Sequence, residues 1–203
     1  MQTIRSAFEA LKIAVATVAP NSIENLNPPA TQEQLSEIQE RVPLLPADWV
    51  EILSLHEGEE MISWISMFPN GMQLMTVNHI LENIRYAESN EEYDGTDLVL
   101  SGQMDRPIGP VKPISLSKKR VPFAHINGEL IWYFDFDPAP GGRAGQIIYE
   151  DLEGSVLSLV ANSLDHLFEQ YQNGLKNGDF FADGDNGQIT SRNKNWCISP
   201  SVR

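Results

Sequence analysis

Apolar residues recur at helical spacing through the first part of the chain. One such set predicts an amphipathic helix near the N-terminus: Ile4, Phe8, Leu11, Val15 and Val18. Thr31 and Gln34 match a capping box and predict the start of a second helix. A third helix is expected within residues 45–58, where Pro46 suits a first turn, and a fourth within 76–95.

From Arg120 onward the hydrophobic period changes from helical to two residues. Four strand candidates follow in succession: RVPFAHI, ELIWYFDF, GQIIYED and SVLSLVA. The first two flank Asn127-Gly128, a strong signal for a two-residue hairpin turn. A closing helix is expected from Ser163 to about Gly178. Helices first, then a meander and a last helix predict an α+β fold, a mostly antiparallel sheet with flanking helices.

This pattern also predicts how the chain is organised. Residues 1–24 form an N-terminal helix extension, and residues 25–178 form the main domain. Residues 179–203 are polar and rich in glycine, so we expect a loosely attached polar C-terminal tail.

Charge narrows the possible partners. The 203 residues include 14 Lys and Arg against 28 Asp and Glu, which gives a net charge of -14. Such a field repels nucleic-acid phosphates and anionic membranes and attracts cationic partners. No apolar run is long enough to span a membrane, and the single Cys197 cannot form an internal disulfide. We therefore expect a cytoplasmic protein that binds neither nucleic acid nor membrane directly.

Asp135 and Asp137 are the strongest candidates for chemistry. Two aspartates separated by one residue could hold a divalent cation, as in glycosyltransferases that bind a metal–diphosphate. In the other interpretation, which we favour, Asp137 and Pro138 open a turn whose positive φ angles come from three glycines: Gly141, Gly142 and Gly145. No nucleophile, zinc-protease or kinase motif occurs, so we predict no catalytic, cofactor-binding or metal-binding residue and no enzymatic activity.

Aromatic residues raise a separate possibility. In the strand LIWYFDF, Ile131, Tyr133 and Asp135 share one face. Tyr133, with the acidic Glu129 and Asp135 nearby, would then face solvent or a protein partner. Alternatively, helices bury both faces of the sheet.

The order of these segments resembles that in the SUKH superfamily, which groups the fungal cell-wall assembly regulator of the Smi/Knr type with many bacterial proteins. Three matching segments carry the resemblance, over roughly Asn25 to Gly178: LPADWVEILSLHEG, VPFAHINGELIWYFDFDPAPGGRAGQII and SLDHLFEQYQNGL. One departure is Glu57, where relatives often have asparagine before the glycine.

The resemblance implies a Smi/Knr-like fold and, for bacterial members, an immunity protein that binds and neutralises a toxin delivered by sister or rival cells. It also implies that the residues around the turn are structural rather than catalytic, namely Asp135, Asp137, Pro138, Gly141, Gly142 and Gly145. A Smi/Knr-like regulatory scaffold is the alternative, and a metal-dependent enzyme at Asp135 and Asp137 is a third.

Charge and resemblance together suggest how a toxin would be bound. A nuclease toxin holds phosphates in a basic cleft, and an acidic inhibitor could occupy that cleft. Candidate partner-binding residues are therefore two acidic clusters outside the shared motif: Glu57, Glu59 and Glu60, then Glu88, Glu91, Glu92 and Asp94.

Overall fold

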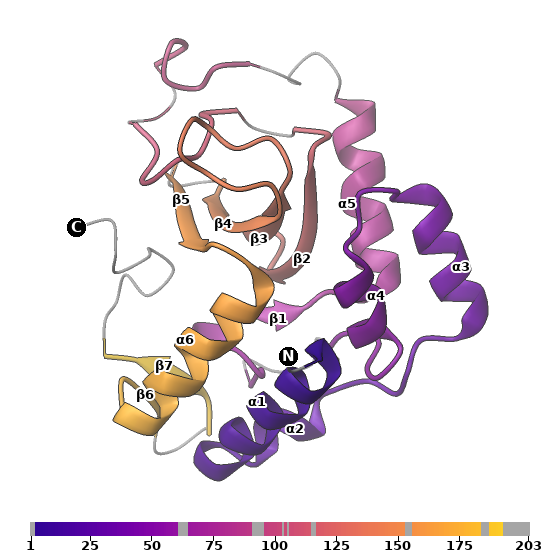
Figure 1. Cartoon of the computed structure of the whole chain (residues 1–203), viewed down its shortest axis with the longest axis vertical. Helices are drawn as coiled ribbons and strands as arrows, with labels where there is room; N and C mark the ends of the chain where they lie inside the picture. The colour runs from indigo at the N-terminus through magenta and orange to yellow at the C-terminus, as the bar shows by residue number, and fades with distance from the viewer. Residues whose placement is uncertain are drawn as a thin grey trace. The chain divides into compact units, whose positions relative to one another are not determined.

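The computed structural model describes residues 3–60, 65–90, 96–102, 104, 106–114, 117–152, 156–183 and 187–192. They group into two compact units. Figure 1 labels the helices and strands of both. The first unit contains the described residues up to Val77 and those from Asp165 onward, and the second runs from Asn78 to Leu164.

The first unit is mainly helical. Its elements are α1 (Ile4–Val18), α2 (Asn21–Glu24), α3 (Gln32–Arg41), α4 (Ala47–Leu53), the 3-10 turn η1 (Pro69–Gly71), β1 (Gln73–Leu74), α6 (Leu164–Asn177, of which Leu164 belongs to the second unit), β6 (Phe180–Ala182) and β7 (Ile189–Ser191). Thr31 and Gln34 form both hydrogen bonds of the predicted capping box at the start of α3.

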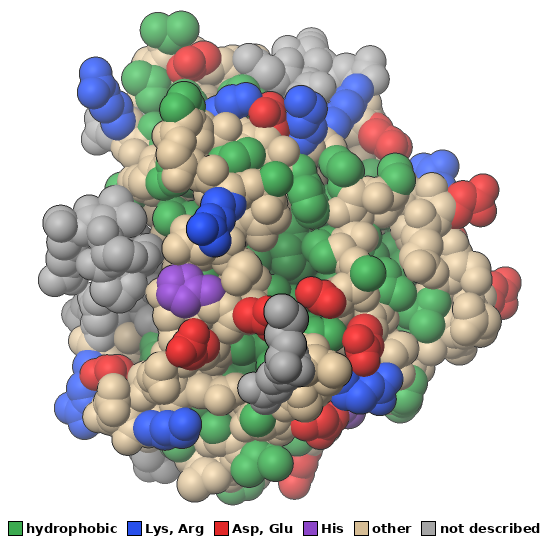
Figure 2. All heavy atoms as spheres, viewed as in Figure 1, with side chains coloured by type: hydrophobic (Ala, Val, Ile, Leu, Met, Phe, Trp, Pro, Cys, Tyr) green, Lys and Arg blue, Asp and Glu red, His purple; other side chains and the backbone are tan. Residues whose placement is uncertain are grey.

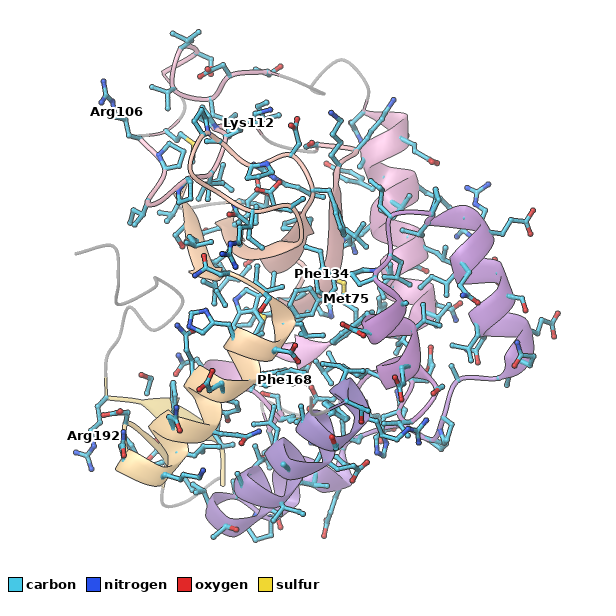
Figure 3. All side chains as sticks on the ribbon, viewed as in Figure 1. Met75, Arg106, Lys112, Phe134, Phe168 and Arg192 are labelled. Atoms are coloured by element: carbon cyan, nitrogen blue, oxygen red, sulfur yellow. The ribbon has the colours of Figure 1, made fainter. Side chains whose placement is uncertain are left out.

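The predicted apolar stripe of α1 lies in the core of this unit. Ile4, Phe8, Leu11 and Val15 are buried, and the ring centroids of Phe8 and Phe168 are 5.8 Å apart. Figure 3 shows Phe168 on α6. The N-terminal helix is therefore packed into the first unit together with a helix that is distant in sequence.

The second unit contains α5 (Val77–Ser89, of which Val77 belongs to the first unit) and four successive antiparallel strands. The strands are β2 (Arg120–Ile126), β3 (Leu130–Asp135), β4 (Gln146–Asp151) and β5 (Val156–Ala161). Asn127 and Gly128 have φ values of 52° and 77°, which the predicted hairpin turn between β2 and β3 requires. The predicted α+β class and meander are confirmed.

The C-terminal segment differs from the expectation of a loose polar tail. Its described residues include β6 and β7, which pair as an antiparallel hairpin. Phe180 and Ile189 are buried, and the ring of Phe180 packs edge-on against Tyr171 at 4.9 Å. This part of the tail is thus attached to the core of the first unit. Two apolar side chains in an otherwise polar segment, Phe180 and Ile189, are buried there.

Within the part of the chain that the structure describes, no helix is long and apolar enough to cross a membrane.

Candidate functional site

The two aspartates of the β3–β4 connection are both engaged by protein donors. Asp135 is 1% exposed, and its carboxylate accepts hydrogen bonds from Gln146 Nε2 (3.0 Å) and from the backbone N–H of Asp137 (3.1 Å). Asp137 Oδ1 lies 2.6 Å from the Nζ of Lys112, whose hydrogen bond holds the pKa of Asp137 below its ordinary value. These contacts favour the turn over a metal site. Among the described residues, no group of three or more His, Cys, Asp or Glu side chains is placed to hold a metal ion.

The remaining residues of the predicted structural motif shape the same connection. Gly141 and Gly145 have φ values of 95° and 83°, which residues with a side chain rarely adopt. Gly142 does not have the positive φ that we expected, and it is required for space instead, because a Cβ there would come within 2.6 Å of the Pro138 Cβ. The backbone N–H of Gly145 donates to the Asp135 carbonyl at 2.7 Å and closes the loop.

Arg120, which sequence reasoning did not single out, anchors this end of the sheet. It is 3% exposed, and its guanidinium donates to the carbonyl oxygens of Ile114 and Lys112 (2.7 Å to Lys112). Its Nε lies 4.0 Å from Asp135 Oδ1. Its only sequence signal was its place at the start of a strand, which does not distinguish a buried arginine from an exposed one.

Glu59 does not lie on the acidic surface that we expected from the sequence, because its side chain is only 1% exposed. Its two carboxylate oxygens accept hydrogen bonds from the backbone N–H groups of Met67 and Leu74, both at 2.7 Å. Burial raises the pKa of Glu59 from 4.5 to about 8, although these two hydrogen bonds act in the opposite direction. Glu59 therefore holds the segment from Met67 to Leu74 and is not available to a partner.

The other acidic candidates divide into three groups. Glu57 is half-buried, and its Oε1 accepts from the backbone N–H of Val77 at 2.7 Å, which satisfies a donor at the start of α5. Glu60 and Glu88 are exposed. The last three, Glu91, Glu92 and Asp94, lie outside the described residues.

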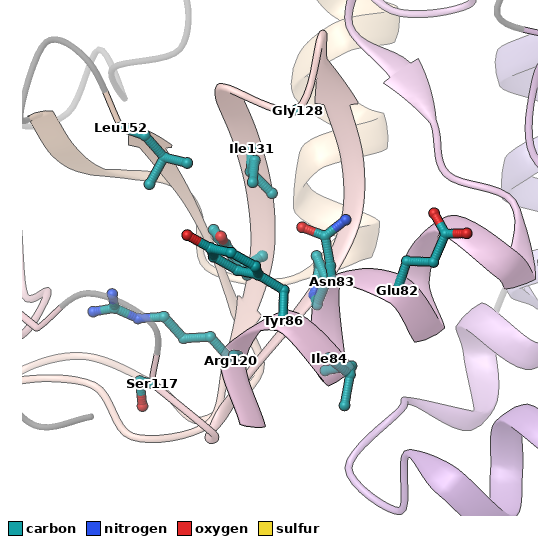
Figure 4. Close-up of a pocket in the computed structure, with 12 residues that line it drawn as sticks. Glu82, Asn83, Ile84, Tyr86, Ser117, Arg120, Gly128, Ile131 and Leu152 are labelled. Carbon is teal, nitrogen blue, oxygen red and sulfur yellow. The ribbon is translucent and has the colours of Figure 1, made fainter. Parts of the chain in front are cut away.

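A pocket of about 370 Å³ in the second unit was not expected from the sequence (Figure 4). It lies between α5 and one face of the sheet, and we call it the α5–sheet pocket. Residues of α5, β2, β3 and the adjoining loops line it, among them Asn83, Tyr86, Arg120, Ile131, Tyr133 and Leu152. No local sequence pattern predicts this pocket, because the residues that line it come from separate stretches of the chain.

Tyr133 forms part of the wall of the α5–sheet pocket. Its side chain is 8% exposed, so it does not stand on an open surface, as one interpretation of the strand suggested. Burial and the neighbouring Glu150, to which its hydroxyl is hydrogen-bonded, raise the pKa of Tyr133 well above its ordinary value. Tyr133 is a neutral, aromatic wall of the pocket.

Two large apolar side chains remain exposed at the rim of the α5–sheet pocket. Tyr86 is 60% exposed and Leu152 is 42% exposed. Exposed apolar groups beside a pocket are a feature of protein- and ligand-binding surfaces. On the face seen in Figure 2, acidic and basic side chains are interspersed.

The comparison with protein families gives one match. The model of the SMI1 / KNR4 family (SUKH-1) matches residues 29–170, which is most of the chain. The comparison with curated proteins gives no match. The chain therefore belongs to the SMI1 / KNR4 family (SUKH-1), and α1 and the β6–β7 hairpin lie outside the matched region.

Proposed function

We propose that this member of the SMI1 / KNR4 family is a non-enzymatic immunity protein, which acts in the cytoplasm by binding and neutralising a basic protein toxin. The observation that carries the proposal is the net charge of -14 on a chain of this family. A nuclease is the favoured class of toxin, because its phosphate-binding cleft is basic and complementary to an acidic inhibitor.

The engagement of the aspartates supports a binding role rather than catalysis. Asp135 and Asp137 form the conspicuous acidic pair of the sequence, and their carboxylates bind Gln146 and Lys112. Their role is to hold a loop. A loop fixed in this way is suited to a rigid scaffold on which other surface residues bind a partner.

Two exposed acids are the candidate contacts that can be tested on the described surface. Glu60 and Glu88 are exposed, so reversing their charge should change the surface potential without disturbing the core. Glu57 and Glu59 are unsuitable for this purpose, because both hold backbone N–H groups.

The experiment is a protection assay. A secreted toxin encoded beside the gene for this chain is produced in the cytoplasm of a test cell, alone or with the chain. We expect wild type to restore growth and to form a stable complex with the toxin. The double variant Glu60→Lys, Glu88→Lys should protect less, and Lys176→Glu, which adds negative charge near the end of α6, should protect fully.

Absence of both growth and complex formation with wild type would contradict the proposal. A stable complex with a resident protein, without protection from any neighbouring toxin, would instead identify a regulatory scaffold.

A further inference from the structure

We propose that the α5–sheet pocket receives an apolar or aromatic side chain from a basic segment of the protein partner. This inference rests on the proposed function, because it names the surface through which the partner is recognised. Of the acidic clusters predicted from the sequence, it uses only Glu88, which follows the pocket residues on α5.

Two polar groups of the pocket lining, the Arg120 guanidinium and the Tyr133 hydroxyl, bind partners within the protein, although the buried Nε of Arg120 has no hydrogen-bond partner among the described residues. The guanidinium of Arg120 donates to the Ile114 and Lys112 carbonyls, and its Nε faces Asp135 at 4.0 Å. The Tyr133 hydroxyl is hydrogen-bonded to Glu150. A charged ligand would have to compete with these contacts, whereas an apolar side chain would leave them intact.

Apolar side chains form much of the remaining lining, beside the polar Glu82, Asn83 and Ser117. Ile84, Ala87, Pro122, Ile131 and Leu152 contribute to it, together with the aromatic ring of Tyr133. About 370 Å³ falls in the range of roughly 300–1,000 Å³ that is typical of small-ligand sites. One large side chain and part of its backbone would therefore fill the pocket.

The rim explains why the partner would be basic. Tyr86 has an exposed aromatic ring. Such a ring can pack against an apolar side chain, and its face attracts the cationic group of a Lys or Arg. Glu82 is an exposed acid in the lining, and Glu88 follows on the same helix. Arg85 lies between them in sequence but does not line the pocket. Like Glu82, the net charge of -14 favours a positively charged partner.

The test uses the full chain and a displayed library of random linear peptides. We expect the selected peptides to carry Phe, Tyr, Trp, Leu or Met next to Lys or Arg. A selected peptide, synthesised with a fluorophore, should bind Tyr86→Ala at least about tenfold more weakly than wild type, as at binding hot spots. Leu152→Ser should also weaken it. The matched control is Leu100→Ser, since Leu100 is 86% exposed in the same unit and does not line the pocket.

Three results would overturn the inference. One is selection of no peptide, or of peptides without a large apolar residue. Another is equal binding to wild type and to Tyr86→Ala. The third is a wild-type dimer in sedimentation that Tyr86→Ala converts to monomer, which would show that a second copy of the chain covers the pocket. Circular dichroism of each variant checks that it is folded.

The same variants separate this inference from the proposed function. If Tyr86→Ala and Leu152→Ser protect as well as wild type against the toxin, while Glu60→Lys with Glu88→Lys does not, the immunity function stands and the pocket inference fails. If wild type protects against no toxin but the peptides still require Tyr86, the pocket binds a basic segment and the immunity function fails.

Discussion

At the scale of single residues, Glu59 shows why an acidic sequence is an incomplete guide to an acidic surface. Glu57, Glu59 and Glu60 stand in one short polar stretch, which predicts a solvated turn. The fold assigns them different roles, because Glu59 is buried on two backbone N–H groups while Glu60 is exposed. Its partners, Met67 and Leu74, are distant enough in sequence that no local rule identifies them.

The raised pKa of Glu59 makes folding stability depend on pH. Because the folded-state pKa of about 8 lies above the ordinary 4.5, the stabilisation from this group is complete below about pH 4.5 and is lost as pH rises through 8. Glu59→Gln cannot titrate, and its amide N–H₂ would face a backbone donor, so we expect it to be less stable by roughly 1–3 kcal/mol. The difference from wild type should be largest near pH 4.5 and should shrink toward pH 8 in urea unfolding experiments.

Glu60→Gln is the matched control for that measurement, because its side chain is exposed one position away. Its stability should follow the wild-type curve closely at each pH. A constant difference between wild type and Glu59→Gln across the whole pH range would show that Glu59 does not titrate in this window.

At the scale of elements, the sequence predicted what local chemistry determines. The capping box of Thr31 and Gln34, the Asn127-Gly128 turn and the stripe of α1 are signals contained within a few residues, and the structure confirms each. The β6–β7 hairpin was missed because each strand has only three residues and polar, glycine-rich segments surround them. The α5–sheet pocket was missed because it exists only after α5 and the sheet are assembled.

The β6–β7 hairpin supplies a direct test of its attachment to the core. Phe180 is 4% exposed against Tyr171, whereas Phe181 on the same strand is 36% exposed. We expect Phe180→Ala to lower the free energy of unfolding by roughly 3 kcal/mol or more. Phe181→Ala should cost about 1 kcal/mol or less, mainly through the contact of its ring with Arg192 at 5.1 Å. Thermal or urea unfolding of the two variants provides the comparison, and equal losses would contradict the attachment of the hairpin seen in the structure.

At the scale of the whole molecule, the excess of acid is a property that no single residue carries. Long-range attraction between a chain of charge -14 and a basic toxin speeds their encounter and is screened by salt. With the toxin from the protection assay, we expect the association rate constant to fall about tenfold or more between about 0.05 and 0.5 M NaCl. The dissociation rate constant should change less in the same stopped-flow series. An association rate constant that does not change with salt concentration would show that long-range electrostatic attraction does not contribute to recognition of the toxin.

The composition of the first unit has a consequence for biosynthesis. Phe8 of α1 packs against Phe168 of α6, and Gln172 donates to the carbonyl of Ala7, so this core joins two segments that are far apart in sequence. The ribosome must therefore release α6 as well as α1 before the core closes. The β2–β5 meander joins neighbouring segments and can form while translation continues. Until then, the apolar stripe of α1 is an exposed surface that a chaperone can bind.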